Sequence, residues 1–220
     1  MKHIKYCMAA GLVLVALLPV AASAAAEGDF ANILQRRNGT GDPVAGKQKS
    51  QVCQGCHGVD GNSTSDQIPK LAGQYDEYII KQMRNYQNGT RSHELMNGMA
   101  APLSDKDLAD IAAYFADQPI MKGDASAPVN ERGKKIFTKG NITEMVMTCA
   151  YCHGNTGKGL DPSTAMYPVI GGQHKAYLLK QLKDFREDDR VNSPNAIMNR
   201  ILRSLNDSEL DALAAYISSL

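Results

Sequence analysis

The clearest hydrophobic pattern in the chain lies near residue 110, where apolar side chains recur at the spacing of a helix. The residues at positions i, i+3, i+4 and i+7 of this stripe are Leu108, Ile111, Ala112 and Phe115. Ser104 precedes the stripe and Asp107 follows three residues later, a spacing at which each side chain can cap the other's backbone amide. The pattern predicts an amphipathic helix that begins after Ser104.

Two further helices are predicted upstream of this one. Asp42 followed by Pro43 is a cap residue followed by proline at the first helical position, and it predicts a helix that runs to Cys53. The next helix has one face that consists of Tyr78, Ile79, Gln82, Met83 and Tyr86. The segment that carries Met96 and Met99 is expected to be a loop.

The second half of the chain repeats this plan. One group of residues recurs at an offset of 99, and a later group, from Leu103 to Tyr114, recurs at an offset of 102. The first group pairs Pro69 with Pro168, Gly73 with Gly172, Gln74 with Gln173, Tyr78 with Tyr177, Lys81 with Lys180, and Gln82 with Gln181. Because the offset grows only between the predicted helices, the insertions lie in loops. The sequence therefore predicts two copies of one small helical unit.

The N-terminal segment differs from both copies. Lysines precede an apolar run from Met8 to Ala22, which ends in the small-x-small site Ala22-Ser23-Ala24. The run is short for a membrane span, which needs ~20 residues. We expect residues 1–24 to be a cleaved signal peptide, with an uncleaved anchor as the alternative. Cys7 precedes the apolar run instead of following it, which argues against a lipoprotein anchor.

Charge and cysteine content narrow the possible functions. The chain has 24 Lys and Arg residues against 23 Asp and Glu residues, so no nucleic-acid partner is expected. It has five cysteines, and apart from Cys7 all of them lie in two short motifs. No disulfide is therefore expected, even in an exported protein.

The duplicated motif is the main chemical signal. Its copies are Cys53-Gln54-Gly55-Cys56-His57 and Cys149-Ala150-Tyr151-Cys152-His153. Two thiols three positions apart lie on one side of a helical turn, and the following histidine reaches the centre of the group that they hold. This is the arrangement of covalent c-type haem attachment. It predicts two covalently attached haem c groups with iron.

Two other interpretations of the motif are weaker. A redox dithiol is expected in a βαβ context, which the predicted helices do not provide, and it leaves the histidine without a role. A zinc ion shared by four cysteines would have to join pairs that lie 96 residues apart, and it would make both histidines coincidental.

With these motifs placed, the chain resembles a dihaem cytochrome c of the cytochrome c4 family. The tandem Cys-x-x-Cys-His motif, the Pro-x-Leu/Ile-x-Gly-Gln segment after each copy and the late methionines carry the resemblance, which covers both halves. It implies an all-α fold of two tandem class I cytochrome c domains. Each would have about three to four helices wrapped around a covalent haem, with the haems near each other at the domain interface. The expected parts are a signal peptide (1–24), a flexible lead-in (25–41), domain 1 (42–118), a linker (119–128) and domain 2 (129–220).

The expected iron ligands are one histidine and one methionine for each haem. His57 and His153 follow from the motif. Met96 lies eight residues before the cap Ser104, and Met198 lies eight residues before the equivalent cap Asn206. This register and the resemblance assign Met96 and Met198 as the sixth ligands. The register aligns Met99 with an isoleucine, so Met99 is expected in the core.

Other residues receive supporting roles from the resemblance. In class I cytochromes the ligating imidazole donates its second N–H to a proline carbonyl, and Pro69 and Pro168 stand in that place. Gly46 and Gly133 are expected where the first helix of each copy crosses the last. The residues near these crossings are Tyr114 and Tyr216, whereas Tyr78 and Tyr177 are expected near the haem pocket or in the core. His93 and His174 are expected to be surface or structural residues.

With both axial positions filled by protein, outer-sphere electron transfer through an exposed haem edge remains. The leading interpretation is a non-enzymatic periplasmic electron carrier between redox partner proteins. These partners would be membrane respiratory complexes such as a terminal oxidase, or soluble donors, and the role allows a loose association with the membrane. The alternatives are a cytochrome subunit of a larger oxidoreductase and, less favoured, a dihaem peroxidase, which would need an open iron position.

Overall fold

The computed structural model describes residues 41–124, 126–141 and 146–220. In these ranges all regular structure is helical apart from one isolated bridge between Asn141 and Val146, which confirms the predicted all-α class. The expected signal peptide and nearly all of the lead-in lie outside the described residues. Within the described ranges, no helix combines the length and the apolar character that a membrane crossing requires.

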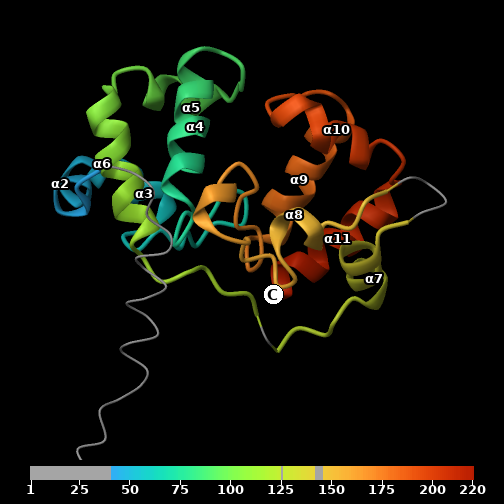
Figure 1. Ribbon diagram of the computed structural model, residues 1–220. Coiled ribbons are helices and arrows are strands. Elements are labelled where there is room, and N and C mark those ends of the chain that lie inside the picture. The colour runs from blue at the N-terminus through green and yellow to red at the C-terminus, as the bar shows by residue number, and fades with distance from the viewer. Residues whose placement is uncertain (1–40, 125, 142–145) are drawn as a thin grey trace, which may run out of the picture.

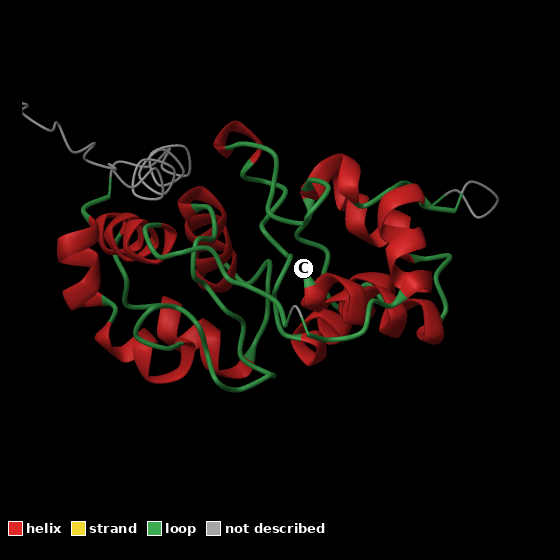
Figure 2. Cartoon of the chain, turned by 90° about the horizontal axis from the view of Figure 1, so that it is seen from below, coloured by secondary structure: helices red, strands yellow, loops and turns green. Residues whose placement is uncertain are grey.

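The helices form two bundles that follow one another along the chain (Figure 1). The first bundle contains α2 (Pro43–Lys49), α3 (Gln51–His57), α4 (Asp76–Gln87), α5 (Glu94–Ala100) and α6 (Asp105–Ala116). The second contains α7 (Glu131–Lys139), α8 (Ala150–His153), α9 (Lys175–Arg186), α10 (Ile197–Leu202) and α11 (Asp207–Ser219), with 3₁₀ turns at Pro162–Thr164 and Pro194–Ala196. Loops drawn in green occupy much of the boundary between the bundles (Figure 2).

Each bundle is organised around its last helix. In the first bundle α6 packs against α2 and α4, and in the second α11 packs against α7 and α9. Both last helices begin with a capping box, the predicted one of Ser104 with Asp107 and an equivalent one of Asn206 with Glu209. The apolar faces of these helices form two separate cores, one around Ile111 and Phe115 and one around Leu213 and Ile217. The repeat seen in the sequence is therefore a repeat in space.

Gly46 and Gly133 lie at the close crossings that were predicted for them. A Cβ atom at Gly46 would lie 1.9 Å from the backbone carbonyl oxygen of Asp110. At Gly133 it would lie 2.0 Å from the carbonyl oxygen of Ala212. Only glycine lets the backbones of the first and last helices approach this closely, so each bundle needs it at this position.

Two predictions about local structure were wrong, one about where a helix ends and one about a segment expected to be a loop. The first helix does not continue to Cys53, because it ends at Ser50 and a new helix, α3, runs through the motif to His57. The buried Ser50 hydroxyl donates to the carbonyl of Lys47, a local bond that competes with the helical backbone pattern. The segment with Met96 is also not a loop. It forms the short helix α5, whose N-terminus His93 caps through its ring nitrogen.

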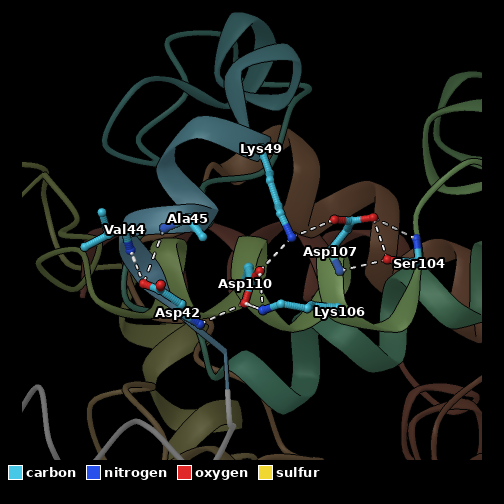
Figure 3. Close-up of polar contacts among 8 residues, drawn as sticks. All are labelled: Asp42, Val44, Ala45, Lys49, Ser104, Lys106, Asp107 and Asp110. Carbon is cyan, nitrogen blue, oxygen red and sulfur yellow. Dashed lines mark hydrogen bonds and ion pairs between the residues drawn. The ribbon is translucent and has the colours of Figure 1, made fainter.

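A buried carboxylate joins α2 to α6 in the first bundle only. Asp110 accepts hydrogen bonds from the Asp42 backbone N–H at 2.9 Å and from the Lys49 Nζ at 2.7 Å, and it also pairs with Lys106 (Figure 3). Lys49 also pairs with Asp107 at 2.7 Å. In the second bundle the positions of Lys49 and Asp110 hold isoleucine and alanine, so the same helix crossing is apolar there.

This cluster predicts an acid-sensitive first bundle. The Asp42 N–H and the Lys49 ammonium hold the pKa of Asp110 well below its ordinary value, and Lys49 with Ser104 lowers the pKa of Asp107 to about 2. A lowered folded-state pKa adds stability above the unfolded pKa of ~3.9, and this stability is lost as the pH falls through the folded value. Asp110→Asn should therefore lower the free energy of unfolding at pH 7 and shrink its loss between pH 5 and pH 2.

Urea unfolding followed by circular dichroism at both ends of that pH range measures this effect. Asp105→Asn is the matched control, because Asp105 is exposed and pairs only with exposed Arg84 among the described residues. It should lower the free energy of unfolding at pH 7 by much less than Asp110→Asn does, because an exposed ion pair contributes little. An equal response from both variants would show that the buried cluster has no special role.

Candidate haem sites

The two motif histidines have the same surroundings. His57 ends α3 and His153 ends α8, and each side chain is 7% exposed. The Nδ1 atom of His57 lies 2.9 Å from the carbonyl oxygen of Pro69, and that of His153 lies 2.9 Å from the carbonyl oxygen of Pro168. A carbonyl only accepts hydrogen bonds, so Nδ1 carries the proton in both rings.

This tautomer leaves the Nε2 lone pair of each histidine available. Burial lowers the pKa of both imidazoles and outweighs the opposing effect of the proline carbonyls, so both rings are neutral at pH 7. Among the described residues, Nε2 of His57 and of His153 has no hydrogen-bond partner. A neutral, oriented imidazole with a free lone pair in a buried setting is the donor that a haem iron requires.

The motif cysteines do not have the properties of a redox dithiol. Burial raises the pKa of Cys53 and Cys152, and it raises that of Cys149 to about 12. A reactive dithiol needs a lowered pKa. In the described part of the chain no three His, Cys, Asp or Glu side chains converge, so the four cysteines are not arranged to share one zinc ion.

The two candidate methionines occupy equivalent helices. Met96 is half-buried on α5, and Met198 is half-buried on α10, where it packs against the core of the second bundle. The expectation that Met99 lies in the core was wrong, because its side chain is 38% exposed. Ala100, the next residue, takes the fully buried position of this helix instead.

An asparagine after each candidate methionine fixes the position of its helix. The Nδ2 atoms of Asn97 and Asn199 each donate to two backbone carbonyls that lie upstream in the same bundle. The acceptors are Tyr86 at 2.7 Å and Arg91 at 3.3 Å for Asn97, and Phe185 and Arg190, both at 2.8 Å, for Asn199. Our sequence reasoning missed both asparagines, although they recur at the same offset of 102 as the methionines.

Two arginines that our sequence reasoning also missed cross the boundary between the bundles. Arg91, from the first bundle, donates to the Tyr177 hydroxyl at 3.1 Å and to Gln181 at 2.8 Å. Arg190, from the second bundle, donates to the Tyr78 hydroxyl at 3.1 Å and to Gln82 at 3.1 Å. Each arginine thus contacts the tyrosine and glutamine that recur in the opposite bundle. Their own recurrence at an offset of 99 is the signal that could have identified them.

This boundary carries uncompensated positive charge. Among the described residues neither Arg91 nor Arg190 pairs with a carboxylate. Burial alone would raise the pKa of the Tyr78 hydroxyl, but the two guanidiniums reverse that effect and lower it. Haem carries carboxylate substituents, so two unpaired guanidiniums beside the candidate sites fit the group that the histidines and cysteines require.

Comparison with known proteins agrees with this site. The family described as Cytochrome c matches the chain twice, at residues 43–118 and 130–220. Together with the duplicated site, this double match defines a dihaem c-type cytochrome that carries electrons and holds two covalent haem c groups.

Individual relatives narrow the family further. The chain is 44% identical to cytochrome c4 of Pseudomonas aeruginosa over 181 residues, which cover 82% of this chain and 89% of that protein. It superimposes on the crystal structure of reduced recombinant cytochrome c4 from Pseudomonas stutzeri with a TM-score of 0.77 and 41% identity, over 82% of this chain and 100% of that one. The chain belongs to the cytochrome c4 family. It is also 32% identical to a thiosulfate dehydrogenase electron acceptor of Stutzerimonas stutzeri over 178 residues, which cover 78% of this chain and 80% of that protein.

Proposed function

We propose that the protein is a periplasmic electron carrier in which each haem is ligated by one histidine and one methionine. The observation that carries this proposal is the duplicated buried imidazole, which donates Nδ1–H to a proline carbonyl and keeps Nε2 free. The apolar N-terminal run, expected to be a signal peptide, supports the location.

The residues divide into equivalent sets, one in each proposed domain (42–118 and 129–220). Cys53 and Cys56 would hold the first haem through thioethers, and His57 and Met96 would ligate its iron. Cys149, Cys152, His153 and Met198 would hold and ligate the second haem. When bound, the haem supplies one-electron chemistry at iron. With one histidine and one methionine on each iron, no ligand position would be open to a substrate, which supports a role without enzymatic activity.

Arg91 and Arg190 would complete these sites by pairing with the haem carboxylates. Their tyrosine and glutamine partners hold each guanidinium at the boundary between the bundles. A charged group that is desolvated in this way interacts more strongly with an opposite charge than it would in water. The arginines would therefore bring the two haems toward one boundary, where electrons could pass between them.

Contact with partner proteins is supported by exposed apolar side chains beside the motifs. Val52 and Val59 flank the first motif and are 69% and 65% exposed, and Tyr151 within the second motif is 70% exposed. Exposed apolar surface of this kind suits a transient protein contact at the haem edge. The partners we propose are a membrane respiratory complex such as a terminal oxidase, or a soluble donor. The similarity to a thiosulfate dehydrogenase electron acceptor favours including soluble donors.

Stopped-flow mixing tests this role directly. The reduced protein is mixed with candidate membrane complexes, and the oxidised protein with candidate soluble donors, over a range of salt concentrations. An electron carrier should exchange electrons rapidly with at least one partner of each kind and should show no peroxide turnover. Peroxide turnover, together with a high-spin ferric haem in the resting protein, would favour the enzyme alternative.

A further inference from the structure

Two glutamines form a reciprocal clamp across the boundary between the bundles. Gln173, from the second bundle, accepts from the Lys70 backbone N–H at 2.8 Å and donates to the Lys70 carbonyl at 2.9 Å. Gln74, from the first bundle, accepts from the Val169 N–H at 3.0 Å and donates to the Val169 carbonyl at 2.8 Å. Both side chains are buried. Each glutamine thus holds the backbone of the opposite bundle with two hydrogen bonds.

The clamped residues directly follow the prolines that hold the histidines. The carbonyl of Pro69 and the N–H of Lys70 belong to one peptide group. That group accepts from His57 Nδ1–H on one side and donates to Gln173 on the other. The peptide between Pro168 and Val169 joins His153 to Gln74 in the same way. A continuous chain of hydrogen bonds therefore leads from each histidine to a glutamine of the other bundle.

Hydrogen bonds on opposite sides of one peptide group strengthen each other. When the N–H donates, its carbonyl becomes more negative and a better acceptor. A stronger bond to Nδ1–H makes the imidazole more electron-donating and raises its basicity as a ligand. A more basic ligand favours Fe(III) over Fe(II), so its effect is to lower the reduction potential of the iron that it binds.

We propose that Gln74 and Gln173 are positioning residues that act across the boundary, each setting the reduction potential of the haem in the opposite bundle. This inference rests on the proposed histidine ligation. It assigns the duplicated glutamine a role beyond packing, since a residue that only held the two bundles together would not have to contact the peptide group bonded to the histidine. Loosening of either clamp by motion between the bundles would change a potential without any change in the ligands.

The test uses the full-length protein with both haems and with ¹⁵N-labelled histidine. Gln173→Met keeps the length of the side chain and removes its amide. In this variant His57 Nδ1–H should exchange with solvent faster, because its bond to the Pro69 carbonyl loses the strengthening of about 10–30% that a second hydrogen bond on the same peptide group supplies. The potential of the first haem should rise, while the exchange of His153 and the potential of the second haem stay unchanged. The histidine resonances report the two sites separately during a redox titration.

Reciprocity and a matched control make the test specific. Gln74→Met should give the mirror result, with a change at His153 and the second haem only. Asn85→Ala removes a neutral hydrogen bond across the same boundary, from the Asn192 side chain at 2.8 Å, and should leave both sites unchanged. Equal shifts at both haems, a shift in the glutamine's own bundle, or the same shift in Asn85→Ala would overturn the proposal.

The test also distinguishes a variant that does not fold, and a failure of the proposed haem ligation, from a failure of the inference about the glutamines. If Gln173→Met does not fold, Gln173→Glu retains an oxygen acceptor for Lys70 N–H, and His57 exchange should stay slow. Fast exchange in Gln173→Glu would contradict the proposal. If the unaltered protein lacks two low-spin haems with histidine and methionine ligands, the proposed function itself fails. If it has them and neither glutamine variant changes the opposite site, only the cross-boundary inference fails.

Discussion

In the Met96→Ala variant, the weak long-wavelength sulfur-to-iron absorption band of the first haem is expected to disappear. Its reduction potential should fall by on the order of 0.1 V, because a thioether favours Fe(II) and the choice of axial ligand alone spans about 0.8 V. Met96 is the candidate because α5 presents it one residue before Asn97, as α10 presents Met198 before Asn199. Absorption spectroscopy combined with a redox titration measures both effects.

Met99→Leu is the control for this prediction. Met99 lies on the same helix as Met96, but its side chain is 38% exposed. Its replacement should leave the sulfur-to-iron band and the potential nearly unchanged. If Met99→Leu removed the band and Met96→Ala preserved it, the register that assigns the ligand would be wrong.

Removing both cysteines of the second motif should have a large effect on the stability of the second bundle. In a Cys149→Ala/Cys152→Ala variant, acid acetone should extract the second haem and leave the first attached. Cys149 packs against the core of the second bundle, and a tightly held ligand stabilises the fold that binds it by about 4 kcal/mol or more. The second bundle should therefore unfold at a clearly lower urea concentration, which circular dichroism will show.

The equivalent change in the first motif is the matched control. Cys53→Ala/Cys56→Ala should lose the first haem, keep the second and destabilise the first bundle more than the second, because Cys53 and Cys149 pack against different cores and a smaller cluster that includes Tyr75 and Val169 joins the bundles. If either double variant folded with its original stability, the haem would not be an essential part of that core.

The elements that could be predicted from the sequence are those with local or repeated signals. The sequence after Ser104 has a capping box and a regular apolar stripe, and both are present in helix α6 of the structure. Gly46 and Gly133 could be placed because the family resemblance implies a close crossing there, and a glycine inside a helix is costly in both copies. The duplication strengthened each of these predictions, since every feature could be sought twice.

The features that could not be predicted depend on individual side-chain contacts, most of them between distant segments. The break at Ser50 is a single residue whose hydroxyl makes a local bond, which no periodicity reveals. The exposure of Met99 follows from the way α5 packs, with Ala100 inside. The cross-boundary partners of Gln173 and Arg91 are set by how the bundles dock. Their recurrence is visible in the sequence, but the partners are not.

We expect the mature protein to carry two covalent haems, one on each Cys-x-x-Cys-His motif. The mass of the denatured protein measures this after extraction with acid acetone, which removes haem that is not covalently bound. The expected result is the mass of the polypeptide plus two haems, with one haem on the peptide around Cys53 and one on the peptide around Cys149. A mass with one haem or none would contradict it.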